Sequence, residues 1–334
     1  MTLPNEFKAL VVTESDDKQF LRTVETKTID DLPAGDVVVQ VNYSSLNYKD
    51  VLSATGNRGV TRSYPHTPGI DAAGIVSAST DARFKPGDEV IVTSYDLGMN
   101  TAGGFGQYIR VPADWVVPLP PGLTLREAMI YGTAGFTAAL SVHQMIANGV
   151  RPGDGDILVS GATGGVGSMA VAILAKSGYA VTAVNGKTDA TDYLTAIGAQ
   201  AVISIEDASD TSSRPMLKGL WAGVIDAVGG DILATAIKSM QPYGTVTCCG
   251  NVASPDLPLN VYPFILRGVT LIGIDSQNCP MPLRQDVWQK IASDWKVDGL
   301  DTLATEASFD ELDQRIDMMI QRKHRGRTII RMTD

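Results

Sequence analysis

A glycine-rich run near the middle of the chain has the residue types and spacing to hold a phosphate group. Gly161, Gly164 and Gly167 form the pattern G-x-x-G-x-x-G between an apolar strand predicted at 156–160 and a helix predicted at 166–176. Glycines let a backbone approach a diphosphate closely, and the N–H groups at the start of the helix can donate to it. Strand, loop and helix together favour a dinucleotide site over a simple turn. The residues predicted to contact the cofactor here are Gly164, Gly165, Val166, Gly167 and Ser168.

The next predicted strand, 180–184, is followed by residues that can distinguish two forms of the cofactor. NAD-specific folds of this kind usually place an acid here, which accepts a hydrogen bond from the ribose 2′-hydroxyl. This chain has Asn185, Gly186 and Lys187 instead, and a lysine can pair with a 2′-phosphate that an acid would repel. The sequence therefore favours NADPH. Two alternatives stay open: Lys187 could lie in a solvated turn, and the nearby Asp189 would oppose a phosphate.

Strands and helices alternate around these two sites at the spacing of a doubly wound parallel sheet. The predicted strands are 156–160, 180–184, 201–204, 223–228, 244–249 and 269–274, with a last short strand at 327–331. Besides a short helical stretch after Thr124, the predicted helices are 135–145, 166–176, 189–197, 231–240, 284–295 and 308–320. Ser308 and Glu311 predict a capping box at the start of the last helix.

The first part of the chain has a different pattern. Apolar and β-branched runs at 8–13, 36–43 and 89–93 are separated by turn signals such as Pro33-Ala34-Gly35, without regular alternation with helices. This pattern predicts an antiparallel, barrel-like domain.

Composition places the chain among globular proteins and excludes some partners. It has 334 residues, of which 44% are hydrophobic, enough for two domains with their own cores. The net charge of −10 argues against nucleic-acid binding, which needs a basic surface.

We see no signal peptide in residues 1–10 and no run approaching the roughly 18 apolar residues of a membrane span. Cys248, Cys249 and Cys279 form no evident disulfide framework, so we expect a cytoplasmic protein.

Several stretches along the whole chain together resemble the medium-chain dehydrogenase/reductase superfamily. They are YSSLNYKD at 43–50, YPHTPGID at 64–71, ADW at 113–115, GTAGFTA at 132–138, WAGVIDAVGG at 221–230, LRGV at 266–269 and LIGIDS at 271–276. The resemblance is to the zinc-free, quinone oxidoreductase-like branch that includes acrylyl-CoA reductases. It implies a Rossmann α/β domain with a doubly wound parallel sheet at residues 125–265. It also implies a β-rich, GroES-like catalytic domain at residues 1–124, completed by residues 266–334.

The same resemblance bears on metal binding. Zinc enzymes of the superfamily take a cysteine and a histidine from the first two of these stretches, where this chain has Asn47 and Ile70. His66 is near but isolated, and three cysteines are too few for a four-cysteine structural site. We therefore expect no metal. Without a Lewis acid to ionise an alcohol, reduction of a polarised C=C bond fits better.

The resemblance implies that NADPH transfers a hydride to the β-carbon of an enoyl thioester such as acrylyl-CoA, while charge develops on the thioester oxygen. The residues that it implies in catalysis are Asn47, Tyr48 and Arg327, and those that it implies in contacts with NADPH, besides the glycine loop, are Tyr48, Asn251, Ser276 and Arg325. Tyr48 could donate a hydrogen bond or a proton, or simply pack against its surroundings. Lys49 and Asp50 are expected to form a local ion pair.

Basic residues are candidates for the phosphates of the cofactor or the substrate. Arg325 and Arg327 could each hold a phosphate of NADPH or of CoA, or lie at the surface. Arg58 and Arg62 could meet the phosphates of CoA, although a solvated loop explains them equally well.

Two other functions stay open. An NADPH:quinone reductase would share the fold and the cofactor and differ in its substrate. A nucleotide-binding sensor would keep the fold without turnover, but the glycine loop is intact. Because members of the superfamily often pair the edges of their sheets, the resemblance also implies a homodimer through residues 269–274.

Overall fold

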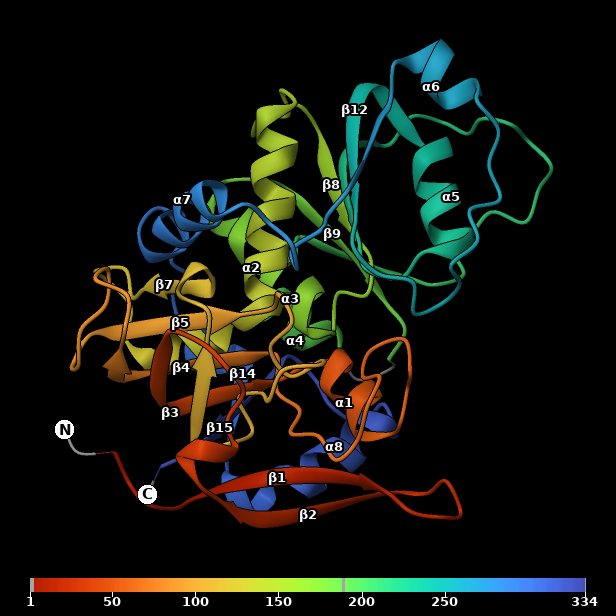
Figure 1. The fold of residues 1–334 in the computed structure, drawn as a ribbon. Helices are drawn as coiled ribbons and strands as arrows, with labels where there is room; N and C mark the ends of the chain where they lie inside the picture. The colour runs from red at the N-terminus through yellow and green to blue at the C-terminus, as the bar shows by residue number, and fades with distance from the viewer. Residues whose placement is uncertain (1–2, 188–189, 334) are drawn as a thin grey trace. The chain divides into compact units, whose positions relative to one another are not determined.

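The computed structural model describes residues 3–187 and 190–333, and the chain divides into two compact units (Figure 1). Unit 1 contains the chain up to Thr133, Gln277–Trp288 and the part from Leu300 onward, and unit 2 contains Ala134–Ser276 and Gln289–Gly299. The first division falls at a kink in α2 (Leu125–Ala147), where Gly132 has a φ of 51°. The second follows β13 (Thr270–Gly273), which is hydrogen-bonded into the sheet of unit 2. The divisions therefore lie about ten residues beyond the predicted 124/125 and 265/266.

Unit 1 is built on a seven-stranded sheet in the order β14-β15-β3-β4-β5-β7, with β6 also paired to β3. Its strands are β3 (Val37–Leu46), β4 (Asp71–Ser79), β5 (Glu89–Thr93), β6 (Tyr108–Val111), β7 (Val116–Pro118), β14 (Ala304–Ser308) and β15 (Arg327–Arg331). All neighbours are antiparallel except β14 and β15. Valines of β3, β4 and β5 form much of a single buried core. The expectation of an antiparallel, β-rich domain is confirmed.

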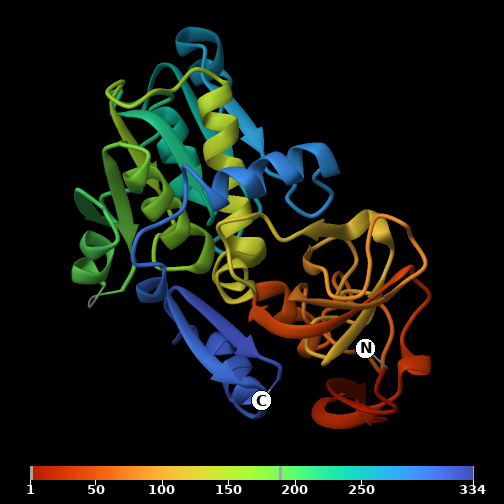
Figure 2. The ribbon, with the colours of Figure 1, turned by 90° about the vertical axis from the view of Figure 1, so that its left-hand side faces the viewer.

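Smaller elements complete unit 1. β1 (Phe7–Glu14) and β2 (Phe20–Lys27) form a separate antiparallel pair. The helices that lie wholly in unit 1 are α1 (Tyr48–Ala54) and α8 (Leu312–Ile320), and short 3-10 turns lie at Ile29–Asp31, Ala113–Trp115, Leu300–Leu303 and Phe309–Glu311. The predicted capping box is present, because the Ser308 N–H donates to Glu311 Oε2 at 2.8 Å, although the first turn is a 3-10 turn. Figure 2 shows α8 beside β14 and β15.

Unit 2 is built on a parallel six-stranded sheet in the order β10-β9-β8-β11-β12-β13. Its strands are β8 (Asp156–Val159), β9 (Val181–Asn185), β10 (Ala201–Ser204), β11 (Trp221–Asp226), β12 (Met240–Cys248) and β13. The chain runs outward from the centre in one direction and then, through β11, in the other. This is the doubly wound Rossmann order, so the predicted fold class is confirmed.

Helices pack on this sheet, with α3 against β8 and β9 and α5 against β11 and β12. The helices of unit 2 are the second part of α2, α3 (Gly165–Lys176), α4 (Thr191–Ala196), α5 (Gly230–Lys238) and α6 (Tyr262–Arg267). α7 (Met281–Ala292) is divided between the units and begins three residues before the predicted 284–295. The predicted start of α4, Asp189, lies outside the described residues. The short helices α1 and α6 were not expected from the sequence.

Candidate active site

The junction between β3 and α1 places the first group of candidate residues. β3 ends at Leu46, and Asn47 is the N-cap residue of α1. The backbone N–H of Asn47 donates to Asp50 Oδ2 at 2.7 Å, which closes the first turn of the helix. β15 runs antiparallel to β3 with Thr328 opposite Leu46. This register brings Arg327, near the end of the chain, beside Asn47.

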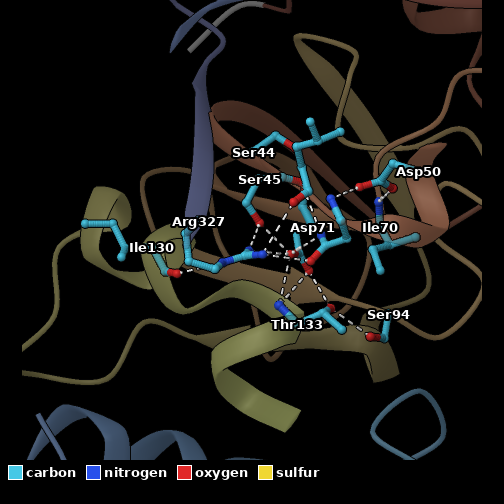
Figure 3. A network of polar contacts seen from close by, with 11 residues as sticks. Ser44, Ser45, Asp50, Ile70, Asp71, Ser94, Ile130, Thr133 and Arg327 are labelled. Carbon is cyan, nitrogen blue, oxygen red and sulfur yellow. Dashed lines mark hydrogen bonds and ion pairs between the residues drawn. The ribbon is translucent and has the colours of Figure 1, made fainter. Parts of the chain in front are cut away.

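A buried carboxylate lies at the centre of the polar network shown in Figure 3. Asp71, the first residue of β4, is fully buried. Its Oδ2 accepts from Ser45 Oγ at 2.5 Å, from Asn47 Nδ2 at 2.8 Å and from the Thr133 backbone N–H at 2.9 Å. Its Oδ1 accepts from Thr133 Oγ1 at 2.5 Å. Such a set of donors is what a charged oxygen needs when it is removed from water.

Arg327 supplies the balancing positive charge, and only 2% of its surface is exposed. Its guanidinium donates to Ile130 O at 3.0 Å, to Asn47 Oδ1 at 3.1 Å and to Ser45 Oγ at 2.7 Å, and it lies 3.7 Å from Asp71 Oδ2. Burial lowers the pKa of Arg327, and the charges of the neighbouring carboxylates oppose that shift. The predicted binding of a phosphate by Arg327 is therefore wrong, because the side chain is enclosed and its donors have partners within unit 1.

The side-chain amide of Asn47 is also hydrogen-bonded within the network. Its amide nitrogen donates to Ser45 O at 3.2 Å and to Asp71 Oδ2 at 2.8 Å, while its oxygen accepts from Arg327. An amide has two hydrogens to donate, and both have acceptors here. Asn47 therefore has no amide hydrogen left to donate to a substrate, and its contacts fix the start of α1. The next residue, Tyr48, has 57% of its surface exposed and can meet a ligand.

Asp50 is a second fully buried carboxylate close to the first. Besides the bond from Asn47, its Oδ1 accepts from the Ile70 N–H at 2.8 Å. Burial, and then the charge of Asp71, raises the pKa of Asp50 to about 7. The predicted ion pair with Lys49 is wrong, since the Lys49 amine donates to Gln277 and the Asp50 carboxylate accepts backbone N–H groups.

Sequence reasoning missed the centre of this network. Asp71 and Gly132 both lie in stretches that carry the family resemblance, but neither was assigned a role. A Cβ added at Gly132 would lie 2.5 Å from Asp71 Oδ2 and 2.6 Å from Arg327 Nη2. Only glycine fits there, and its positive φ kinks α2 so that the N–H of Thr133 reaches the carboxylate. The Gly-Thr pair within an otherwise helical run was the available signal.

The glycine loop in unit 2 lies between β8 and α3, as predicted. Gly164 is the N-cap residue of α3, and the N–H groups of Gly165, Val166 and Gly167 have no backbone acceptor in the part of the chain that the structure describes. A Cβ at Gly167 would lie 2.3 Å from Gly161 O, so this glycine lets the helix pack against the loop. These donors form a site that suits a diphosphate.

Ser168 does not belong to this set of donors. Its side chain is fully buried, and its hydroxyl faces Gly165 O at 3.4 Å. Its N–H donates to Gly164 O at 2.9 Å within the helix. The prediction that Ser168 contacts the cofactor is wrong, because both of its donors are used inside α3.

The residues predicted to select the cofactor line one pocket of about 350 Å³ at the ends of β9 and β10. Asn185, Gly186 and Lys187 form one side of it. Asn185 Oδ1 accepts from the Lys187 N–H at 2.8 Å, which holds the turn after β9. Ser204 and Glu206, which follow β10, line the same pocket and were not singled out from the sequence.

The residues predicted on the nicotinamide side follow β12 and β13. Asn251 lines an open hollow with Cys248, Cys249 and Asp275. Ser276 Oγ accepts from Thr137 Oγ1 at 2.8 Å. Both lie near the carboxyl ends of parallel strands, the edge at which such sheets bind ligands. Their contacts with a cofactor stay predictions.

The remaining basic candidates differ in their surroundings. Arg58 pairs with Glu14, donates to Arg62 O at 2.8 Å and lies 5.0 Å from the centre of the Tyr64 ring. These partners do not favour a role for Arg58 with CoA. Arg62 is exposed, and Arg325 is half-buried in the loop before β15, so their roles stay predictions.

Comparison with known families settles the evolutionary relationship. Residues 33–121 match the model described as the alcohol dehydrogenase GroES-like domain, and residues 165–294 match the model described as zinc-binding dehydrogenase. The chain belongs to the medium-chain dehydrogenase/reductase superfamily. Despite the name of the second model, the described residues of this member contain no group of three or more His, Cys, Asp or Glu placed to hold a metal ion.

Individual members of the superfamily cover almost the whole chain. The acrylyl-CoA reductase AcuI of Ruegeria pomeroyi is 43% identical over 97% of this chain and 98% of its own. YhfP of Bacillus subtilis, provisionally named a quinone oxidoreductase, is 48% identical over 92% of this chain and 94% of its own. The chain is therefore an oxidoreductase of this family.

Two solved structures share the fold closely. The YhdH oxidoreductase of Salmonella enterica, solved with NADP, has a TM-score of 0.95 and 43% identity, covering 98% of this chain and 100% of its own. YhfP of Bacillus subtilis, solved with NAD, has a TM-score of 0.96 and 46% identity with the same coverage. The structure with NADP supports the prediction of NADPH as the cofactor. Among the described residues of this chain, no helix is long and apolar enough to cross a membrane.

Proposed function

We propose that this protein reduces the C=C bond of acrylyl-CoA, or of a similar small enoyl-CoA, with NADPH. The observation that carries the proposal is the likeness to the acrylyl-CoA reductase of Ruegeria pomeroyi along nearly the full length of both chains. The local geometry supports it: an uncovered helix start suits a diphosphate, and Tyr48 has 57% of its surface exposed.

The residues of the chain have distinct parts in this reaction. The N–H groups of Gly165, Val166 and Gly167 bind the diphosphate of the cofactor, and Lys187 pairs with its 2′-phosphate. Bound NADPH supplies a hydride to the β-carbon of the enoyl thioester. The Tyr48 hydroxyl donates a hydrogen bond to the thioester oxygen, where negative charge develops, and water supplies the proton to the α-carbon.

The buried network around Asp71 acts by positioning. Asp71 and Arg327 hold the amide of Asn47, and Asp50 holds its backbone N–H. Tyr48 follows Asn47 directly, so these contacts fix the backbone from which the exposed hydroxyl extends. A donor that is already in place costs no reorganisation as the charge develops.

Reduction of quinones is the second candidate, because YhfP is as similar to this chain as the acrylyl-CoA reductase is. NADPH oxidation with acrylyl-CoA, crotonyl-CoA and benzoquinone compares the candidates under one set of conditions. We expect kcat/KM for acrylyl-CoA to exceed that for benzoquinone at least about a hundredfold. NADPH deuterated at the transferred position should leave its label on the β-carbon of propionyl-CoA, measured by mass spectrometry. Faster turnover of benzoquinone, or absence of labelled propionyl-CoA, would refute the proposal.

We further propose that the protein is a homodimer and that it works in the cytoplasm. β13 ends the six-stranded sheet and pairs only with β12 among the described strands. Next to it along the chain, α6 exposes two thirds of the surface of Ile265 and 63% of that of Leu266. An unpaired strand edge beside an apolar helix fits a second copy of the same surface across a two-fold axis.

A further inference from the structure

The pocket at the ends of β9 and β10 contains a feature that a pocket for a phosphate alone would not need. Of the described residues that line it, Lys187 and Glu206 carry opposite charges. The others are small, polar or apolar: Asn185, Gly186, Thr191, Val202, Ile203, Ser204 and Ile205. The formal charge of the described lining residues is therefore zero at neutral pH. A 2′-phosphate carries a charge near −2, so the lysine attracts it while the glutamate repels it.

Glu206 is held in the pocket wall by the local fold. Ser204, the last residue of β10, lies opposite Asn185 of β9 in the parallel register. The Ser204 hydroxyl donates to Asp207 Oδ2 and accepts from the Asp207 N–H, both at 3.0 Å. The Ala208 N–H donates to Ser204 O at 3.1 Å. These bonds fix the turn that carries Glu206.

The carboxylate of Glu206 has no structural partner within the described part of the chain. It is exposed, and neither a hydrogen bond nor an ion pair joins it to another described side chain. The neighbouring acids are engaged: Asp207 bonds to Ser204, and Asp210 pairs with Lys238 at 2.9 Å. Glu206 is thus an acceptor facing the space in which the adenosine ribose of a dinucleotide binds in this kind of fold.

An acceptor at this place has a known chemical use. Carboxylates near the end of the second strand of a Rossmann sheet accept hydrogen bonds from the 2′-hydroxyl of NAD(H), and a 2′-phosphate removes that donor. Here the turn after β9 has a lysine in place of the acid, and the turn after β10 supplies one. The same pocket therefore has a cation for a phosphate and an acceptor for a hydroxyl.

We propose that this pocket accepts NADH as well as NADPH, with Lys187 recognising the 2′-phosphate and Glu206 the 2′-hydroxyl. The inference rests on the cofactor site proposed above and extends the activity to a second reductant. With NADH, the hydride passes from the nicotinamide to the β-carbon of the enoyl thioester and a proton from water joins the α-carbon, leaving NAD⁺ and the saturated thioester. Glu206 is the residue that limits discrimination between the two cofactors.

The test measures dissociation constants of NADPH and NADH by nicotinamide fluorescence with no substrate present, so that it does not depend on the reaction. We expect wild-type protein to bind NADH no more than about tenfold more weakly than NADPH, a difference of about 1.4 kcal/mol. Glu206→Gln should tighten NADPH and weaken NADH, each about two- to fivefold, as for an exposed charged contact. Lys187→Gln should have the opposite effect on NADPH and leave NADH within about twofold.

Asp192→Asn is the matched control, because it removes one negative charge from α4 beside the pocket residue Thr191 without lining the pocket. It should change neither constant more than about 1.5-fold. Absence of NADH binding to the wild type would overturn the proposal. Unchanged constants in Glu206→Gln, or an equal shift in Asp192→Asn, would also overturn it. Tight binding of both cofactors without turnover of any enoyl-CoA would instead refute the proposed function and leave this inference intact.

Discussion

Asn47 and Tyr48 are neighbours in the chain, yet their side chains have opposite surroundings. Asn47 is 8% exposed and fully hydrogen-bonded, whereas Tyr48 is 57% exposed. A residue that is closed off on all sides can orient the chain but cannot touch a substrate. At the residue scale we therefore propose that the buried polar side chains position the start of α1 and that Tyr48 contacts the substrate.

Replacement of Tyr48 by phenylalanine removes only that hydroxyl. We expect kcat with acrylyl-CoA to fall about a hundredfold, because a donor to the developing oxyanion is lost. The KM for NADPH should change less than about twofold. Steady-state kinetics with both substrates varied measures the two effects. Tyr243→Phe is the control, since Tyr243 is 82% exposed on unit 2 and lies outside the proposed site. Equal kcat values for Tyr48→Phe and wild type would contradict the assignment.

Asp71→Asn tests the charge balance of the network. The substitution leaves Arg327 buried without its carboxylate, and we expect the free energy of unfolding to fall by about 3–5 kcal/mol. Urea denaturation measures this change. The double variant Asp71→Asn with Arg327→Met removes both charges and should lose less stability than the two single variants added together. Strict additivity would show that the two groups do not interact.

Asp50 makes stability depend on pH. Its pKa is raised to about 7 in the folded protein by burial and by the charge of Asp71, and it lies near 3.9 in an unfolded chain. The folded state therefore keeps a proton that the unfolded state has released. The resulting stabilisation is fully present below about pH 4 and is lost as pH rises through 7. We expect Asp50→Asn to lose less stability than wild type between pH 5 and about 8 in urea titrations. Parallel pH profiles would contradict the shifted pKa.

At the scale of elements, the start of α3 depends on how closely the helix approaches the preceding loop. A Cβ at Gly167 would lie 2.3 Å from a backbone oxygen, whereas at Gly164 the nearest atom would be 3.3 Å away. A side chain at Gly167 would therefore clash with the loop much more severely than one at Gly164. At Gly167 the atoms that a Cβ would meet belong to the backbone of Gly161 and Ala162, which cannot shift easily.

This inequality predicts different effects of the same substitution. Gly167→Ala should displace the helix start and weaken NADPH binding at least about tenfold, while Gly164→Ala should weaken it less than about threefold. Fluorescence titration of NADPH into both variants provides the comparison. Far-ultraviolet circular dichroism confirms that α-helix content is kept. A larger effect at Gly164 than at Gly167 would show that the loop binds the cofactor in another way.

At the scale of the whole molecule, the proposed homodimer uses the exposed apolar side chains of α6 beside the end strand β13. Leu266→Glu places a charge in that surface, and we expect the dimer to dissociate to monomers. Light scattering after size-exclusion chromatography measures the mass. Leu21→Glu, at a similarly exposed leucine of β2 in unit 1, should leave the mass unchanged. A wild-type protein that is already monomeric would contradict the proposed assembly.

Much of the fold could be predicted from the sequence, because it depends on local periodicity. The strands of unit 2, its helices other than α6, the doubly wound parallel sheet and the glycine loop followed from apolar runs separated by turn signals. The polar network could not be predicted in the same way. Asp71, Asn47 and Arg327 lie in three separate parts of the chain, and only the pairing of β15 with β3 and the kink at Gly132 bring them together. The burial of Arg327 and Asn47, which corrected their predicted roles, depends on those long-range contacts.

The position of Arg327 in the chain has a consequence for synthesis of the protein. Asp71 and Asn47 leave the ribosome early, but the guanidinium of Arg327, which balances the charge of Asp71, is synthesised about 250 residues later. Until then, the growing chain carries the carboxylates of Asp50 and Asp71 without the arginine that balances their charge in the folded protein. A nascent chain should therefore keep this region open and hydrated until β15 has left the ribosome and can pair with β3. Deletion of β15 would therefore remove contacts of Asn47 and Asp71, which lie far earlier in the sequence.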